Sequence, residues 1–350
     1  MKNGVYGFGI IGLGAIADVH AKAIATLDDG ELVACFDMVP GKAEKFCEGH
    51  GGKPYSKLEE FLQDPGLDIV TVTTPSGAHL EVALAALRAK KTVIVEKPME
   101  ITTERIDQLI RTAKENHVML AGVFQSRFFD APKAVKAAID AGRFGTISLI
   151  NAQVEWYRSQ DYYDKVGWHG TWKMDGGGAL MNQAIHAIDL LGWFGGPVDE
   201  IYGQTACLSH QRIEVEDVAA ATVRFKSGAL GIIEGTTGCY PGFSKRIEVC
   251  GSKGSAIIEE ENLVYWHFDE EGPEDEEIRR RCMGSTSNGG AHNPLDVGFM
   301  GHAREFANVV DALKHHTAPA IPGEEARKAV EIITTIYQSA REHRPIKLDS

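Results

Sequence analysis

Residues 5–17 read VYGFGIIGLGAIA, an apolar run that passes into a G-x-G-x-x-A pattern. The apolar run predicts a buried strand, and residues 16–27, which follow it, have the apolar periodicity of a helix. Gly12 permits a tight turn, Gly14 lets the backbone approach a pyrophosphate, and Ala17 allows close packing of the helix. Free N–H groups at the helix N-terminus complete an anion site. The stretch therefore predicts a dinucleotide site whose loop contacts are Gly12, Gly14, Ala15 and Ile16.

An acidic residue, Asp37, ends a second predicted strand over residues 31–36. Its carboxylate can accept hydrogen bonds from the adenosine ribose and would repel a 2′-phosphate. Residues 38–40 contain no arginine that could hold such a phosphate. Asp37 therefore favours NAD over NADP as the cofactor.

Strands and helices continue to alternate as far as residue 124. The strand-like runs cover residues 67–73, 92–95 and 118–124, and helical patterns separate them. This alternation predicts an α/β domain with a doubly wound parallel sheet, the Rossmann architecture, over residues 1–128.

Polar residues follow these strands at their carboxyl ends, the edge of an open α/β sheet where ligands bind. The run TVIVEKP, residues 92–98, ends a buried strand in Glu96 and Lys97, so Lys97 is a candidate to face a bound molecule. A surface lysine after a buried strand is the alternative. His79 could contact the nicotinamide or cap a helix. The cofactor contacts predicted at this edge are Thr74, Pro75, His79, Glu96 and Lys97.

The pattern changes after residue 129, where strand-like runs follow one another without crossover helices. Such runs predict an antiparallel sheet, so residues 129–350 are expected to form an α+β substrate-binding domain whose C-terminal helices pack back on the first domain. The second face of this large, mostly antiparallel sheet is expected to join copies of the chain into a homodimer or homotetramer. Residues 270–277 predict an acidic, solvated loop. The predicted strands cover residues 147–156, 201–208, 218–225, 229–236, 245–250, 255–259 and 263–268.

A glycine run, residues 176–178, leads into a predicted helix over residues 179–189. Asn182, His186 and Asp189 are spaced to form one polar stripe on an otherwise apolar helix. Each must be satisfied by a hydrogen bond or a ligand, because an unpaired polar group in a core costs about 1 to 3 kcal/mol. A satisfied core histidine is the alternative for His186, whereas the glycines favour close approach of a ligand.

The composition excludes several classes of partner. The 36 basic and 49 acidic residues give a net charge of −13, which disfavours binding to nucleic acid or to a membrane. The sequence has no apolar signal segment and no apolar run of the roughly 20 residues that a transmembrane helix needs, so we expect a cytoplasmic protein. The six cysteines form no C-x-x-C pair, which argues against a metal site and a disulfide framework.

Four motifs resemble those of the glucose-fructose oxidoreductase and inositol dehydrogenase (Gfo/Idh/MocA) family. They are G-x-G-x-x-A at residues 12–17, EKP at 96–98, GGG-x-L-x-N-x-x-x-H at 176–186 and GEEARKAV at 323–330. The resemblance covers essentially the whole chain. It implies a sugar dehydrogenase in which Lys97 and His186 are the catalytic pair. Many members carry Asp where this chain has Asn182, so an Asp-His pairing is not available here.

A nearer resemblance is to the branch that contains UDP-N-acetylglucosaminuronate 3-dehydrogenases. It rests on WYRSQDYY at residues 156–163, GTW at 170–172, MNQA at 181–184 and EVED at 214–217. One departure is His169, where that branch is expected to carry arginine. A neutral imidazole cannot replace a bidentate guanidinium, which argues against an identical recognition of a uronate carboxylate.

The resemblance implies hydride transfer between a sugar alcohol, at ring C3 if the nearer branch holds, and NAD. His186 would remove the hydroxyl proton as general base, Lys97 would stabilise the developing alkoxide, and Asn182 would hold the sugar or the imidazole. Both groups are expected to meet at one alcohol beside the nicotinamide. The substrate-binding candidates are Gln125, Arg127, Arg158, Tyr163, His169, Trp172, Lys173, Asn182 and His186, with His302 a further candidate for the cleft.

Other interpretations stay open from the sequence. Aromatic residues that pack the sheet, with Arg or Lys at its rim, would explain the substrate-binding candidates equally well. The substrate could be an inositol or a free glycoside. A non-catalytic NAD or sugar sensor would be expected to lose Lys97 or His186, and this chain keeps both. A glycoside-cleaving enzyme that uses bound NAD transiently is a further alternative.

Overall fold

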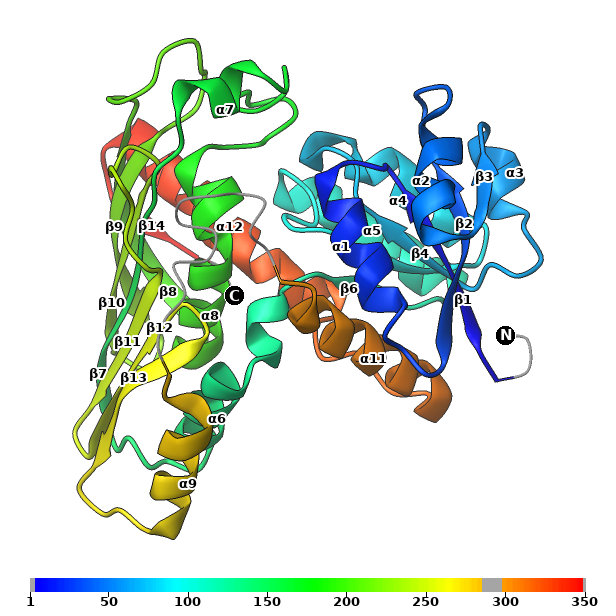
Figure 1. Cartoon of the computed structure of the whole chain (residues 1–350). Coiled ribbons are helices and arrows are strands. Elements are labelled where there is room, and N and C mark those ends of the chain that lie inside the picture. Colours follow the sequence, from blue (N-terminus) through cyan, green and yellow to red (C-terminus); the bar gives the residue numbers. More distant parts are fainter. Residues whose placement is uncertain (1–3, 285–297, 349–350) are drawn as a thin grey trace. The chain divides into compact units, whose positions relative to one another are not determined.

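The computed structural model describes residues 4–284 and 298–348. The chain forms two compact units (Figure 1). The first unit comprises residues 4–125 and 298–327 of the described chain, and the second comprises residues 126–284 and 328–348.

The first unit contains a six-stranded, all-parallel sheet in the order β3-β2-β1-β4-β5-β6. The strand order reverses between β1 and β4, which is the topological switch point where doubly wound sheets bind ligands. The predicted Rossmann architecture is confirmed. The strands are β1 (Tyr6–Ile11), β2 (Gly30–Phe36), β3 (Lys53–Tyr55), β4 (Ile69–Val72), β5 (Thr92–Val95) and β6 (Leu120–Gly122).

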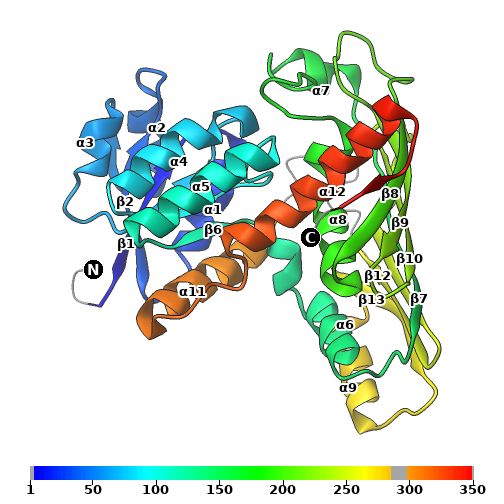
Figure 2. The ribbon, with the colours of Figure 1, turned by 180° about the vertical axis from the view of Figure 1, so that it is seen from behind.

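Helices cover both faces of this sheet. Helices α1 and α11 lie on one face in Figure 1, and α4 and α5 lie in front of the other face in Figure 2. Their bounds are α1 (Ala15–Ile24), α2 (Lys42–His50), α3 (Leu58–Leu62), α4 (His79–Arg88), α5 (Thr103–Asn116) and α11 (Met300–His315), with a short 3-10 turn η1 (Ser76–Ala78).

The core between β1, α1 and α11 joins segments nearly 300 residues apart. Phe8 of β1 stacks on Phe306 of α11, with ring centroids 6.0 Å apart, and Ile24 of α1 is fully buried in the same cluster. Burying a side chain such as Phe306 contributes roughly 1.5 to 3 kcal/mol. Residues 300–315, although late in the sequence, are therefore part of the first unit.

The second unit contains an eight-stranded mixed sheet in the order β13-β12-β11-β7-β10-β9-β8-β14. Strands β7 and β10 pair in parallel, and the other neighbours are antiparallel, which confirms the predicted sheet. The strands are β7 (Ile147–Glu155), β8 (Val198–Ala206), β9 (Val218–Phe225), β10 (Leu230–Thr236), β11 (Arg246–Gly251), β12 (Gly254–Glu259), β13 (Asn262–Phe268) and β14 (Ile346–Lys347).

Helices cover one face of the second sheet. In both views α6, α8 and α9 lie on the same side of the strands (Figures 1 and 2). Along β9 the side chains alternate, with Ala221 and Val223 buried and Thr222 and Arg224 exposed, as expected for a sheet with one covered face. The remaining helices are η2 (Gln125–Phe128), α6 (Asp130–Asp140), α7 (Gln160–Asp164), η3 (Ala179–Ala184), α8 (Ile185–Gly195), α9 (Pro273–Cys282) and α12 (Gly323–Glu342). Both η2 and α12 begin in residues of the first unit.

The predicted acidic loop at residues 270–277 is wrong, because α9 begins within it. Gly272 is the N-cap and Pro273 the first residue of this helix. Proline is favoured at the first helical position, and the acidic residues Glu274 and Glu276 stabilise the positive end of the helix dipole. The Gly-Pro pair therefore starts a helix.

Among the described helices, none is long and apolar enough to cross a membrane.

Candidate active-site residues in each unit

The loop between β1 and α1 has the features that a bound pyrophosphate requires. Gly12 has φ +90°, and a Cβ there would lie 2.7 Å from the backbone nitrogen of Thr74, so the position needs glycine. At Gly14 a Cβ would meet nothing within 4 Å, so its backbone is open to a ligand. Ala17, in the first turn of α1, is fully buried. These residues fit the loop of a dinucleotide site.

Asp37 lies directly after β2 and is held in place by three donors. Its carboxylate accepts hydrogen bonds from the backbone N–H of Leu13 at 2.8 Å and of Val39 at 2.9 Å, and it pairs with the Lys42 ammonium at 2.8 Å. Burial would raise the pKa of Asp37, but the hydrogen bonds from Lys42, Leu13 and Val39 together lower it below its usual value. The ionised carboxylate is therefore favoured. Lys42 was missed from the sequence because it lies beyond residues 38–40.

His79 is buried and joins the loops that follow β4 and β5. Its Nε2 lies 2.8 Å from the carbonyl oxygen of Thr74, and its Nδ1 lies 3.0 Å from that of Pro98. Only 1% of the residue is exposed. The ring therefore connects two loops at the carboxyl edge of the sheet, and the predicted nicotinamide contact of His79 stays a prediction. Thr74 and Pro75, also predicted contacts, lie in the first of these loops.

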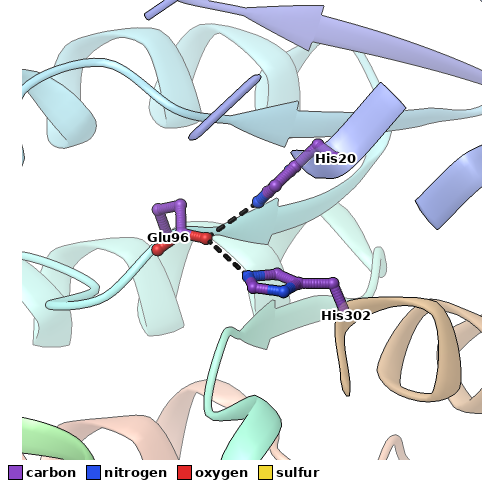
Figure 3. A group of neighbouring side chains, drawn as sticks. All are labelled: His20, Glu96 and His302. Atoms are coloured by element: carbon purple, nitrogen blue, oxygen red, sulfur yellow. Dashed lines mark hydrogen bonds and ion pairs between the residues drawn. The ribbon is translucent and has the colours of Figure 1, made fainter. Parts of the chain in front are cut away.

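Glu96 is the centre of a buried cluster with two histidines. Its Oε1 lies 2.8 Å from His20 Nε2 and 3.3 Å from His302 Nε2 (Figure 3). Its Oε2 accepts the backbone N–H of Lys97 at 3.0 Å. Burial would raise the pKa of Glu96, but the hydrogen bonds from His20 and His302 hold it well below the usual value.

His302, which was predicted to face a cleft, is 1% exposed and lies against Glu96 within the first unit. His20 was missed from the sequence. It lies one turn after Ala17 on the inner face of α1, where a polar residue among apolar ones is a signal that sequence reasoning could have used.

Lys97 follows β5 at the carboxyl edge of the parallel sheet, as predicted. The four residues of β5 are fully buried or nearly so, and the side chain of Lys97 is half-buried. A cis peptide bond joins Lys97 to Pro98. Lys97 therefore lies at the edge of the sheet where a ligand of this fold binds.

In the second unit, the three glycines before η3 allow close contact between parts of the protein itself. Gly176 has φ +77°. A Cβ on Gly177 would collide with the Tyr337 hydroxyl, and one on Gly178 would collide with the carbonyl oxygen of Glu216. The expectation that these glycines admit a ligand needs correcting, because Tyr337 and Glu216 occupy the space beside them.

Glu216 caps the helix that these glycines precede. Its carboxylate accepts the N–H groups of Gly178 and Leu180, both at 2.9 Å, and its backbone carbonyl oxygen accepts that of Ala179 at 3.1 Å. The Tyr337 hydroxyl donates to the same carboxylate at 2.8 Å. Burial, the largest effect, raises the pKa of Glu216 to about 7, although these hydrogen bonds oppose the shift. Sequence reasoning missed Glu216 because it is 38 residues from Gly178.

The predicted stripe of Asn182, His186 and Asp189 is only partly correct. Asn182 lies in η3, a π-helical turn, and its amide donates to Asp175 at 2.7 Å, whereas His186 lies in α8. From residue 175 to 191, Asn182 and His186 are the two residues that are not buried. His186 is therefore partly buried, not fully buried. A single π-helical turn is often found at a functional site.

Asp189 does not extend that stripe, because it pairs with Arg127 in the interior of the second unit. Arg127 Nε lies 2.8 Å from one carboxylate oxygen and Nη2 lies 2.7 Å from the other, and both side chains are buried. The guanidinium also lies over the ring of Trp193, 5.1 Å from its centroid. The geometry is that of an ion pair that fixes α8, and a substrate contact of Arg127 stays a prediction.

The remaining substrate-binding candidates differ in exposure. Arg158 is buried and lies over the rings of Trp156 and Tyr162, and its burial lowers the pKa of the guanidinium. Tyr163 is buried and its hydroxyl lies 2.8 Å from that of Thr237. These contacts agree with the structural interpretation that the sequence left open.

Three candidates lie between α7 and η3, where side chains are more accessible. His169 stacks on Tyr162, with centroids 4.4 Å apart, and its Nδ1 lies 3.1 Å from the Tyr162 carbonyl oxygen. Trp172 and Lys173 are exposed, and the Trp172 ring packs edge-on against Tyr337. Gln125, the remaining candidate, is half-buried at the end of the first unit. Their roles toward a substrate stay predictions.

Two family profiles match the chain. One, described as "Oxidoreductase family, NAD-binding Rossmann fold", matches residues 6–124. The other, described as "GFO/IDH/MocA C-terminal domain", matches residues 133–257. The two matches together cover most of the chain and fall one in each unit.

The chain is also similar to individual proteins over its full length. It is 34% identical to the WlbA dehydrogenase from Bordetella pertussis, solved in complex with NADH and UDP-GlcNAcA, with a TM-score of 0.91 and coverage of 100% of this chain and 99% of that one. It is 27% identical to the myo-inositol 2-dehydrogenase of Thermotoga maritima, over 97% of this chain and 98% of that protein. It is 25% identical to the inositol 2-dehydrogenase of Rhizobium meliloti, with the same coverage, 97% and 98%.

Proposed function

Because this chain belongs to the Gfo/Idh/MocA family of NAD-binding oxidoreductases, we propose that it oxidises a secondary ring alcohol of a nucleotide sugar, at C3 of the pyranose. The observation that supports this substrate class is the full-length likeness to the Bordetella pertussis dehydrogenase, which was solved in complex with NADH and UDP-GlcNAcA. Bound NAD supplies the hydride acceptor. The residues of this chain supply the proton acceptor and the charge that stabilises the alkoxide.

His186 is the proposed general base. It is one of two accessible residues between positions 175 and 191, and the cap made by Glu216 fixes the start of its helical segment. A positioned base of this kind contributes typically 10²- to 10⁴-fold to the rate. Asn182, whose amide nitrogen is held by Asp175, is proposed to hydrogen-bond the sugar through its other atoms.

Lys97 is the proposed electrostatic partner. Its ammonium would lie near the oxygen that loses the proton and stabilise the negative charge that develops there. The backbone N–H of Lys97 donates to the Glu96 carboxylate. This hydrogen bond fixes the backbone from which the long and flexible lysine side chain extends. Lys97 and His186 are proposed to act on the same hydroxyl group.

NAD is the proposed cofactor in preference to NADP. The ionised Asp37 would accept the ribose hydroxyls and repel a 2′-phosphate, and the open backbone at Gly14 would accept the pyrophosphate. Lys42 offsets part of the charge of Asp37, so the discrimination against NADP should be smaller than an unpaired carboxylate would give.

A second candidate substrate is an inositol. The likeness to the Thermotoga maritima myo-inositol 2-dehydrogenase favours it, although the identity is lower, at 27%. His169, in place of an arginine, also weakens the case for bidentate recognition of a uronate carboxylate. For this reason UDP-GlcNAc, a UDP-sugar without that carboxylate, is included among the substrates to be tested.

Self-association is proposed through the uncovered face of the second sheet. Tyr202, Leu230 and Tyr265 are exposed on this face, where they would contribute apolar surface to an interface. Light scattering at micromolar concentration should give a dimer or tetramer, and Leu230→Glu should lower the mass. A monomer at all concentrations would contradict this proposal.

The enzymatic proposal is tested by NADH absorbance with UDP-GlcNAcA, UDP-GlcNAc, myo-inositol and a free glycoside as substrates. We expect turnover with a UDP-sugar, and a fall of about 10²- to 10⁴-fold in Lys97→Met and His186→Ala. Wild-type turnover in either variant would refute its role. Sugar cleavage without net NADH would favour the glycoside-cleaving alternative, and NAD binding without any reaction would favour a sensor.

A further inference from the structure

We propose that His20 and His302 are positioning residues that act through Glu96 to fix Lys97 (Figure 3). Both imidazoles meet the same carboxylate oxygen, and the other oxygen holds the backbone N–H of Lys97. The role in turnover rests on the function proposed above, whereas the hold on the Lys97 backbone can be tested without any substrate.

The three side chains come from separate elements that meet in the core of the first unit. His20 lies in α1, the helix that starts at the dinucleotide loop, Glu96 ends β5, and His302 lies in the first turn of α11. His302 and Glu96 are 206 residues apart in the sequence. The cluster therefore ties the end of β5 to the helices on one face of the sheet.

Hydrophobic packing alone does not explain these polar side chains. His20 is fully buried beside Ala17 and Ile24, and its ring packs edge-on against Phe306 at 5.0 Å. The Nδ1 atoms of His20 and His302 have no hydrogen-bond partner among the described residues. An apolar residue at either position would avoid this unfavourable burial. Histidines at positions 20 and 302 are explained if the Glu96 carboxylate, which they hold in place, has a functional role.

The cluster is better suited to hydrogen bonds than to a metal ion. The three ligand atoms lie within 4.8 Å of one another, which would be close enough for a metal. A metal-bound imidazole ordinarily donates its other N–H to a carboxylate or a carbonyl group, and no such acceptor faces either Nδ1 in the described chain. An N–H donor on each Nε2 fits the distances to Oε1, which are 2.8 Å from His20 and 3.3 Å from His302.

Fixing Glu96 matters for Lys97 because the two residues are adjacent at the point where the strand ends. Glu96 Oε2 accepts the Lys97 N–H, so rotation of the carboxylate would release the backbone from which the ammonium extends. A displacement of about 1 Å in a catalytic group can lower a rate by about 10²-fold. Two imidazoles on Oε1, one from each helix, restrict that rotation.

The variants at His20, His302 and Glu96 differ in where they place the hydrogen-bond donor. In His302→Gln and His20→Gln the amide nitrogen can reach the place of Nε2, whereas in His302→Asn it stays near the place of Nδ1. His302→Leu removes the donor but keeps an apolar volume. Glu96→Gln keeps an oxygen for the imidazoles but turns an amide N–H toward the N–H of Lys97. His315→Leu, on the exposed last turn of the same helix, is the matched control.

We expect His302→Leu, His302→Asn and Glu96→Gln to lower kcat by about 10- to 100-fold. We expect His302→Gln and His20→Gln to stay within about threefold of the wild type, because their amide nitrogens restore the donor. The dissociation constant for NAD, measured by calorimetry, should change by less than about threefold in His302→Leu and His302→Asn, because His302 is not a predicted cofactor contact. Wild-type kcat in His302→Leu, or equal losses in the Gln and Asn variants, would overturn the proposal.

Amide hydrogen exchange of the peptide over residues 93–101 tests the same hold without turnover. Exchange at Lys97 should be faster in His302→Leu and Glu96→Gln, and unchanged in His315→Leu. If the wild type oxidises no sugar, the proposed function fails while this measurement still decides the hold on Lys97. Unchanged exchange in both variants, or one tightly bound metal ion per purified chain by elemental analysis, would overturn the positioning role.

Discussion

Gly178 and Glu216 are in such close contact that no side chain fits between them. A Cβ on Gly178 would collide with the backbone carbonyl oxygen of Glu216, and the N–H of Gly178 donates to the carboxylate of the same residue at 2.9 Å. The glycine therefore lets one residue cap the helical segment that carries Asn182 and His186.

We expect Gly178→Ala to lower the free energy of unfolding by more than about 2 kcal/mol, because the added methyl group must displace backbone and not a flexible side chain. Urea unfolding followed by circular dichroism measures this change. Gly49→Ala is the control, since a Cβ there meets nothing within 4 Å and lies in an exposed helix. Equal stability of Gly178→Ala and the wild type would contradict this contact between Gly178 and Glu216.

The raised pKa of Glu216, about 7, predicts a pH dependence of stability. The folded state holds the proton more tightly than the unfolded state, in which the carboxyl has its ordinary pKa of about 4.3. The protonated Glu216 carboxyl therefore makes its full contribution to the free energy of unfolding below about pH 4.3. This contribution declines as pH rises toward 7 and is lost above 7. Its size is of the order of 3 kcal/mol.

Glu216→Gln should remove this decline, because glutamine does not titrate. The measurement is the free energy of unfolding at pH 5, 6, 7 and 8 for both proteins, in the same buffer series. The difference between the wild type and Glu216→Gln should shrink or change sign as pH falls from 8 to 5. Parallel curves across this range would show that Glu216 does not titrate there.

Asp37 and Lys42 predict how the cofactor preference can be changed. Asp37→Asn removes the charge that repels a 2′-phosphate, and it also releases the Lys42 ammonium, now 2.8 Å from the carboxylate, to pair with that phosphate. We expect affinity for NADP to rise at least about tenfold relative to NAD, a change of about 1.4 kcal/mol. Calorimetric titration with both nucleotides measures it, with Asp29→Asn, at an exposed position, as the control. An unchanged ratio would remove Asp37 from the ribose site.

The buried pair of Arg127 and Asp189 predicts a stability effect that is separate from activity. Arg127→Met leaves the Asp189 carboxylate buried without its bidentate partner, which typically costs 3 to 5 kcal/mol. Replacing both, with Arg127→Met and Asp189→Leu, should recover most of that loss. Chemical unfolding measures both variants, and KM measured on the folded double variant tests whether Arg127 also binds substrate. If Arg127→Met raised KM and left the free energy of unfolding unchanged, the result would favour a substrate-binding role for Arg127 instead.

The architecture of both units could be predicted because its signals are local. The spacing of Gly12, Gly14 and Ala17, the apolar strand before Glu96 and the run of hairpin-connected strands each lie within a few residues. The acidic stretch around Gly272 shows the limit of such signals, since a Gly-Pro pair can end one element or begin a helix.

By itself, the sequence determined the parallel and antiparallel sheets, the dinucleotide loop and the strand ends at which Lys97 and Asp37 lie. Only the tertiary structure decided which polar groups satisfy one another. It assigned Glu216 to Gly178, Arg127 to Asp189, and His20 with His302 to Glu96, pairs that lie 38, 62, 76 and 206 residues apart. The physical reason is that a buried polar group must find a partner wherever the fold provides one, and separation along the chain does not limit where that partner comes from.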